Sequence, residues 1–140
     1  MLPINLISVL VAGVAAFIVG FLIHGPIAGK LWMKLANIHP TGNEKLKDMV
    51  PQMIKNLFAN FLAAYVLAMF IYPIASYYNT LGSVAGGMGI AFWAWLGFTA
   101  TATSMDVIWM GKSRKLWMFD VLSSLLVTMT MGAILAYWMV

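Results

Sequence analysis

Four long apolar stretches, separated by shorter polar segments, organise the chain. They cover about residues 4–23, 53–74, 84–110 and 116–140. Each is near or above the roughly 20 residues with which an α-helix crosses a hydrocarbon core about 30 Å thick. The pattern predicts an all-α polytopic membrane protein, with four transmembrane helices in a single domain over residues 1–140. Because no Lys or Arg precedes the first stretch, we interpret it as a retained span and not as a signal peptide.

The basic residues lie in or beside only two of the three connections. Connection 76–82 and both termini carry no Lys or Arg. The eight basic side chains are Lys30, Lys34, Lys45, Lys47, Lys55, Lys112, Arg114 and Lys115. By the positive-inside rule, connections 24–52 and 111–115 are predicted to be cytoplasmic and both termini to lie outside. We expect the membrane to be the cytoplasmic (inner) membrane of a prokaryote.

The first connection contains its own helix signals. Apolar residues spaced four apart over 26–36 predict a short interfacial helix, with Pro26 in its first turn. Thr41 and Glu44 fit a capping box, which predicts that the next helix begins there and is kinked at Pro51.

The tetrapeptide Lys-Leu-Trp-Met occurs twice, at 30–33 and 115–118, each time at the expected cytoplasmic surface. Lysines there reach for lipid phosphate and tryptophans prefer the membrane interface. We therefore predict Lys30, Trp32, Lys115 and Trp117 to be interfacial anchors. Whether the recurrence reflects a duplication stays open.

Composition supports the membrane interpretation and removes several kinds of chemistry. The chain is 63% hydrophobic and only 9% charged, too few charges for a soluble domain of this size. The absence of cysteine excludes disulfides and thiolate ligands, and two histidines form no recognisable zinc set, so no metal site is predicted. The net charge of +4 flanks apolar spans, which favours anionic lipid over nucleic acid as its counterpart.

Several polar side chains are expected at one depth, close to the basic connections. Asp106 and Asp120 lie inside predicted spans, where an ionisable residue is a functional hypothesis by default. The full predicted intramembrane polar cluster is His24, Asn56, Asn60, Thr103, Asp106 and Asp120. Two interpretations compete: a structural clamp of the acids with Lys112, Arg114 and Lys115, which we favour, and a proton or ion relay. For the amides and hydroxyls we favour interhelical hydrogen bonds over a ligand pocket.

Small residues recur at intervals of four in three of the spans. Such spacing lets membrane helices approach closely, within one chain or between chains. The predicted packing residues are Ala12, Ala16, Gly20, Gly82, Gly86, Ser124, Thr128, Gly132 and Ala136. Four short spans make a thin bundle, so we expect a homo-oligomer or a larger membrane complex.

Three segments resemble a known family. They are "GPIAGKLWM", the Trp95-x-Gly97-Phe98 segment, and "MGAIL" ahead of Trp138. With them the chain is similar to the bacterial and archaeal family called domain of unknown function 1761. Members more often have Trp-Tyr-Ser-Pro where this chain has residues 23–26, "IHGP". The resemblance implies a four-span membrane protein and brings no activity and no catalytic residues.

No catalytic residues are predicted, because the chain has no G-x-S-x-G, H-E-x-x-H or phosphate-binding glycine loop. We therefore expect a non-enzymatic membrane subunit that associates with itself or with a partner. One alternative is a small homo-oligomeric transporter or channel coupled through Asp106 and Asp120. A second alternative is an enzyme acting on lipid or quinone. No cofactor is expected beyond bound lipid.

Overall fold

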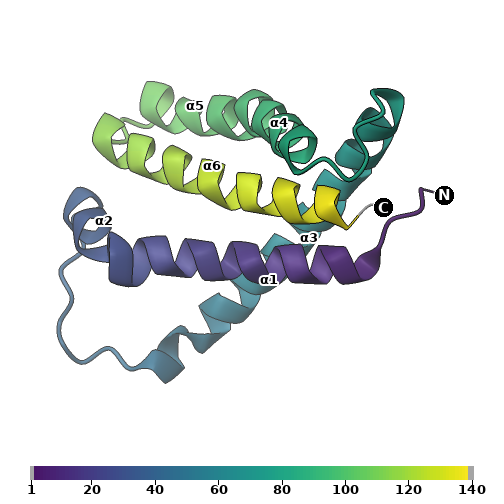
Figure 1. The fold of residues 1–140 in the computed structure, drawn as a ribbon. Coiled ribbons are helices and arrows are strands. Elements are labelled where there is room, and N and C mark those ends of the chain that lie inside the picture. Colours follow the sequence, from purple (N-terminus) through teal and green to yellow (C-terminus); the bar gives the residue numbers. More distant parts are fainter. Residues whose placement is uncertain (1, 139–140) are drawn as a thin grey trace.

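A computed structural model describes residues 2–138, which form helices and connecting loops without any strand in that range (Figure 1). The elements in chain order are α1 (Leu6–Leu22), the π-helical segment η1 (Ile23–Ile27), α2 (Gly29–Leu35), α3 (Leu46–Tyr77), α4 (Val84–Ala94), the π-helical segment η2 (Trp95–Ala100), α5 (Thr101–Trp109) and α6 (Arg114–Tyr137). Four continuous helices are long and apolar enough to cross a membrane: Leu6–Ile27, Leu46–Tyr77, Val84–Trp109 and Arg114–Tyr137. The predicted all-α polytopic fold with four spans is confirmed.

Polar side chains at the helix ends explain where several helices begin and stop. The Asn5 side chain accepts hydrogen bonds from the N–H groups of Ile7 at 2.9 Å and Ser8 at 3.4 Å, and so caps α1. Two asparagines with left-handed backbone conformation, Asn37 and Asn79, end α2 and α3. After each, a backbone N–H bonds five residues back, as in a Schellman motif.

The first connection differs from its prediction in two places. Pro26 does not open an interfacial helix, because it lies inside η1, which continues α1, and the short helix α2 begins only at Gly29. The prediction that the next helix begins at a capping box formed by Thr41 and Glu44 was also wrong. Glu44 does accept from the Thr41 N–H at 2.7 Å, but this closes a turn within the loop, and α3 begins at Leu46.

Of the predicted fourth span, residues 139–140 lie outside the described part.

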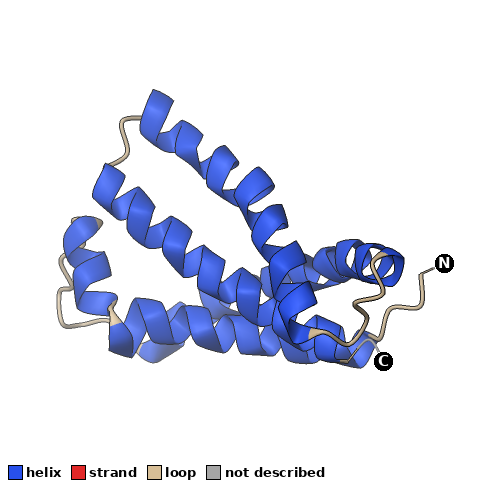
Figure 2. Ribbon diagram, turned by 45° about the horizontal axis from the view of Figure 1, so that its top comes forward, coloured by secondary structure: helices blue, strands red, loops and turns tan. Residues whose placement is uncertain are grey.

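Helix α6 is the centre of the molecule, since it packs against α1, α3 and α4, while α1 packs also against α3. The helices are close together near the two termini and fan apart toward the opposite end (Figure 2). We call residues 2–16, 64–94 and 125–138 the terminal half, and residues 17–63 and 95–124 the basic half. The basic half contains every Lys, Arg, Asp and Glu of the chain.

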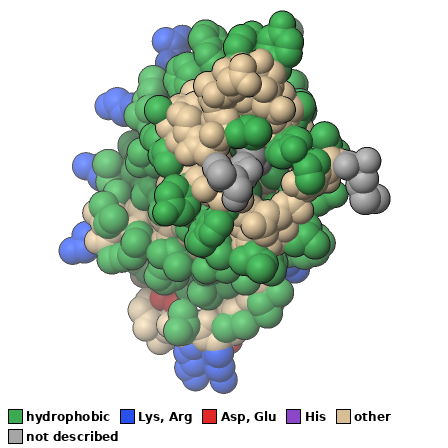
Figure 3. Space-filling model, turned by 45° about the vertical axis from the view of Figure 1, so that its right-hand side comes forward, with side chains coloured by type: hydrophobic (Ala, Val, Ile, Leu, Met, Phe, Trp, Pro, Cys, Tyr) green, Lys and Arg blue, Asp and Glu red, His purple; other side chains and the backbone are tan. Residues whose placement is uncertain are grey.

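The hydrophobic core belongs to the terminal half. Its buried members come from α1, α3, α4 and α6 and are Val9, Ala12, Ala16, Ala64, Leu67, Ala68, Ile71, Ala75, Ala91, Met131, Leu135 and Ala136. In the basic half, the buried residues among those described are Gly29, Trp95, Val121 and Ser123. Hydrophobic side chains cover most of the outer surface when the termini are turned forward, and Lys and Arg appear at its left and lower edges (Figure 3).

A close contact between helix backbones joins α4 to α6 through two glycines. A Cβ added to Gly132 would stand 2.6 Å from the Ala91 Cβ and 2.7 Å from the Gly87 carbonyl oxygen. A Cβ added to Gly87 would collide in turn with Ala136 and with the Gly132 backbone. In a membrane, where no hydrophobic force drives helices together, such backbone contact is a main source of helix association.

Candidate functional site

The structure divides the predicted polar cluster into separate groups. The first group is His24, Lys112 and Asp120, at the junction of η1 with the start of α6. The Lys112 Nζ lies 2.9 Å from the Asp120 Oδ2, and the His24 Nε2 lies 4.0 Å from the Asp120 Oδ1. These side chains are about one-third exposed. Asp120 therefore has the basic neighbour that the clamp interpretation requires.

His24 is held on three sides. Its Nδ1 lies 3.0 Å from the Gly20 carbonyl oxygen, which can only accept, so this ring nitrogen carries the proton and donates. The rings of Trp32 and Phe119 meet the imidazole edge to face, with centroids 5.3 and 5.5 Å away. The ring orientation leaves Nε2 as the nitrogen on the Asp120 side.

The family-like segment Gly29-Lys30-Leu31-Trp32 has a structural role at this place. A Cβ on Gly29 would lie 2.7 Å from the His24 carbonyl oxygen, so glycine allows α2 to fold back onto η1. This return places Trp32 against the His24 ring. Lys30 on the same helix is exposed.

The second group joins α5 to α6. The Trp117 indole N–H donates to the Thr103 hydroxyl oxygen at 3.1 Å. Trp117 therefore also makes a helix–helix contact, beside its predicted role as an anchor. Lys115 two residues earlier is exposed. Asp106, on α5, makes no side-chain hydrogen bond or ion pair with any residue from 2 to 138, although its carbonyl oxygen accepts from Lys112 N–H at 3.1 Å.

The third group is the amide pair on α3. Asn60 Nδ2 donates to the Asn56 carbonyl oxygen at 2.8 Å and to its Oδ1 at 3.1 Å. Both bonds stay within α3, so the pair makes none of the interhelical hydrogen bonds that the sequence favoured. Asn56 is exposed and Asn60 is half-buried.

Asn60 also lines a cleft between α3, η2 and α6, which we call the α3–η2 cleft. Its volume is about 480 Å³, and Trp95, Thr99, Ser124 and Thr128 contribute to its walls. The Trp95 indole N–H donates to the Ser124 hydroxyl at 2.9 Å, and the Ser124 and Thr128 hydroxyls donate to carbonyls of their own helix. Within residues 2–138, the Asn60 Oδ1 on α3 and the Thr99 hydroxyl on η2 have no hydrogen-bond partner.

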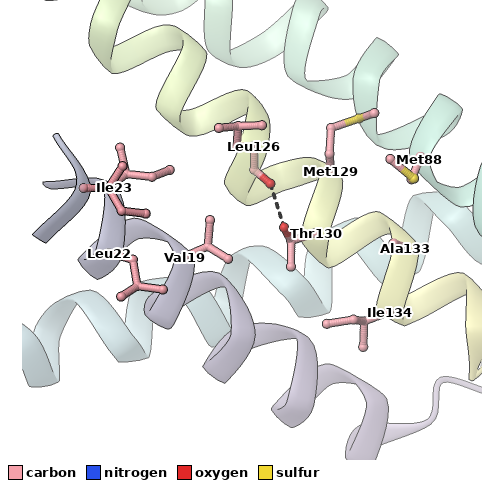
Figure 4. A pocket seen from close by; sticks show the side chains of 10 residues that line it. Val19, Leu22, Ile23, Met88, Leu126, Met129, Thr130, Ala133 and Ile134 are labelled. Carbon is pink, nitrogen blue, oxygen red and sulfur yellow. Dashed lines mark hydrogen bonds between the residues drawn. The ribbon is translucent and has the colours of Figure 1, made fainter. Parts of the chain in front are cut away.

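A second cavity, which we call the α1–α6 groove, lies between α1 with η1, α6, and Met88 of α4. Its volume is about 540 Å³. Figure 4 shows Val19, Leu22 and Ile23 along one wall and Leu126, Met129 and Ala133 along the other. Its single polar lining residue is Thr130, whose hydroxyl donates to the Leu126 carbonyl oxygen at 2.8 Å. The groove thus has no free hydrogen-bonding side chain.

The predicted packing residues have different fates. Ala12, Ala16, Gly132 and Ala136 are buried in helix contacts, and Ser124 bonds Trp95 across helices. Gly20 is looser, since a Cβ there would lie 3.8 Å from Val127, and the Thr128 hydroxyl bonds within α6. The prediction for Gly82 and Gly86 was wrong: Gly82 precedes α4, and the atoms nearest to a Cβ on Gly86 belong to Thr80 and Ser83, which precede α4 and do not lie on another helix.

Sequence reasoning named Asn60, Ser124 and Thr128 but did not predict that they line one cleft, and it missed the glycine that packs α4. The contact glycine is Gly87, one position beyond the predicted Gly86. The spacing Gly87-x-x-x-Ala91 matches Gly132-x-x-x-Ala136 and was the available signal. Trp95 was noted only as part of the family resemblance, and its hydrogen bond to Ser124 depends on how η2 packs against α6.

These features define the class: an all-α polytopic membrane protein with four spans, of which α6 is the central one. Among residues 2–138, no three His, Asp or Glu side chains gather as a metal-ligand set. The chain belongs to the family described as protein of unknown function DUF1761, whose model matches residues 7–136. The resemblance read from its motifs is therefore confirmed. No curated protein and no solved structure matches the chain.

Proposed function

We propose that this protein is a non-catalytic membrane subunit that associates through its basic half, with itself or with a partner. The observation that supports the proposal is the α3–η2 cleft. The Asn60 Oδ1 on α3 and the Thr99 hydroxyl on η2, which have no hydrogen-bond partner among residues 2–138, belong to residues that line this cleft between membrane-spanning helices. An unsatisfied polar group in hydrocarbon costs several kcal/mol, and polar side chains across helices are a usual remedy.

The packing of the two halves supports the same proposal. Helix α5 contains no buried residue, and α3 has none before Ala64. The exposed side chains on this part of α3 include Ile54 and Phe58, which are 62% and 70% exposed. Lipid satisfies these apolar side chains, but it offers no fixed partner to the neighbouring amides. A helix of a second molecule, seated between α3 and α5, provides both contacts.

The ion pair of Asp120 with Lys112 favours the subunit over the transporter. An acid held at 2.9 Å by a lysine contributes to local structure, because removal of either partner would leave the other charge without its counter-ion. The relay would then depend on Asp106, which has no side-chain partner within residues 2–138. The lipid- or quinone-directed enzyme lacks a nucleophile with its base near either cavity.

The test compares two glycines that have the same local space. Nothing lies within 4 Å of a Cβ added at Gly97 or at Gly89, and both positions are exposed, so we expect Leu at either position to be compatible with the fold. Gly97 is exposed and lies in the sequence between the cleft-lining residues Trp95 and Phe98, whereas Gly89 is exposed on α4 in the terminal half. We expect Gly97→Leu to block approach to the cleft and Gly89→Leu to leave it open.

The measurement is native mass spectrometry and blue-native electrophoresis after mild extraction from the membrane. The expected result is a species larger than the monomer for the unaltered chain and for Gly89→Leu, and a shift to monomer for Gly97→Leu. Because the chain has no cysteine, Phe58→Cys can be cross-linked against a Leu10→Cys control on the terminal half. A strictly monomeric chain with no co-purifying protein contradicts the proposal.

A further inference from the structure

We propose that the α1–α6 groove is a binding site for one anionic phospholipid, with an acyl chain in the groove and the phosphate at its basic end. The α1–α6 groove and the α3–η2 cleft differ in the hydrogen bonds that an occupant would have to supply. The α3–η2 cleft has polar groups without partners, whereas the one hydroxyl of the α1–α6 groove is satisfied within α6. A groove without hydrogen-bonding demand suits a hydrocarbon chain.

The groove points toward the basic residues. Its wall on α1 continues through Ile23 into η1, and Ile27 is its last lining residue there. Lys30 follows Ile27 by three residues, on α2 and exposed. On α6, residues 119, 126, 130 and 133 have the spacing of one helix face. The face that lines the groove at Leu126 and Thr130 therefore also carries Phe119, whose ring contacts the His24 ring.

Charge at this end complements an anionic headgroup. All eight Lys and Arg and all four acids lie in the basic half, so the whole net charge of +4 is concentrated there. Near the groove end, Asp120 is matched by Lys112, and Lys30 on α2 has no side-chain hydrogen bond or ion pair with any residue of the described chain. A phosphate beside Lys30 therefore meets a cation that no carboxylate of residues 2–138 neutralises. Each basic residue near an anionic membrane surface contributes about a fivefold preference.

The experiment measures lipid retention by native mass spectrometry from nanodiscs of equal parts phosphatidylglycerol and phosphatidylcholine with identical acyl chains. We expect the protomer to retain one phosphatidylglycerol, at least about fivefold over phosphatidylcholine. Lys30→Gln should lower this preference about fivefold, whereas Lys47→Gln, a lysine of the first turns of α3, should leave it unchanged. Equal retention of the two lipids, or an equal loss in both variants, overturns the proposal.

A second pair of variants tests the acyl chain independently of the headgroup. Ala133→Phe fills the groove from α6, and the matched control Leu122→Phe changes an exposed residue of the same helix that lines neither cavity. We expect Ala133→Phe to reduce retention of phosphatidylglycerol at least threefold while the control has no effect. Gel filtration and thermal unfolding of both variants in detergent establish that they are folded. Unchanged retention in a folded Ala133→Phe protein overturns the assignment of the groove.

Discussion

The terminal half and the basic half are built from the same four helices but are held together by different kinds of contact. In the terminal half, glycine and alanine bring helix backbones together, and long side chains such as Ile71 and Leu135 fill what remains. In the basic half, the helices diverge and indole N–H groups and an ion pair span the distance. The difference indicates that the terminal half holds the fold together, and the basic half is where we propose that partners and lipid bind.

The largest effect is expected where α4 touches α6. Gly87→Ala places a Cβ against Ala136 and the Gly132 backbone, so the helices must separate. Overpacking of this kind costs about 1–3 kcal/mol. Gly89→Ala, two residues along the same helix, meets nothing within 4 Å and gains up to about 1 kcal/mol of helix propensity. Thermal unfolding in one detergent measures both.

If the Gly87→Ala and Gly89→Ala proteins were equally stable, the contrast drawn between the terminal half and the basic half would lose its basis. It would mean that the α4–α6 contact does not determine the stability of the terminal half. The reciprocal variant, Gly132→Ala, gives an independent check, because its Cβ meets Ala91 at 2.6 Å from the other side.

A smaller effect is expected for the hydrogen bonds that attach η2 and α5 to α6. A double-mutant cycle of Trp95→Phe and Ser124→Ala should give a coupling free energy of about 0.6 kcal/mol, typical of hydrogen bonds between membrane helices. The same cycle on Trp117 and Thr103 should give a similar value. Unfolding free energies of the four proteins in each cycle supply the measurement. Coupling near zero in both cycles would show that these bonds do not hold the basic half.

Much of the fold could be predicted from the sequence, because span length, hydropathy and helix-capping residues act locally. The four spans and the buried alanines of α1 are of this kind. Which residues of the predicted polar cluster contact one another depends on how far the helices diverge. The local sequence pattern does not encode this distance. Asn60 was expected to bond another helix and instead bonds Asn56. The predicted packing pair Gly82 and Gly86 was wrong, because Gly82 lies in the loop before α4, which begins at Val84. The glycine that contacts α6 is Gly87.

The smallest expected effect lies in the loop before α3, far from the packed core. The pKa of Glu44 is lowered, first by the hydrogen bond from the Thr41 backbone N–H and further by the Thr41 hydroxyl and the Gly42 N–H. A lowered pKa means that the carboxylate supports the turn above its ordinary value near 4.5 and that this support is lost as the pH falls through the lowered value.

Hydrogen-exchange protection of the Thr41 and Gly42 amides, corrected for the intrinsic rate, should therefore fall on acidification in this fully exposed loop. Glu44→Gln should have low protection at every pH. The terminal half has no carboxyl side chain, so the protection of its core amides should not respond over the same range. A parallel acid response in both halves would mean that the loop is coupled to the core, and the two halves would then not be independent.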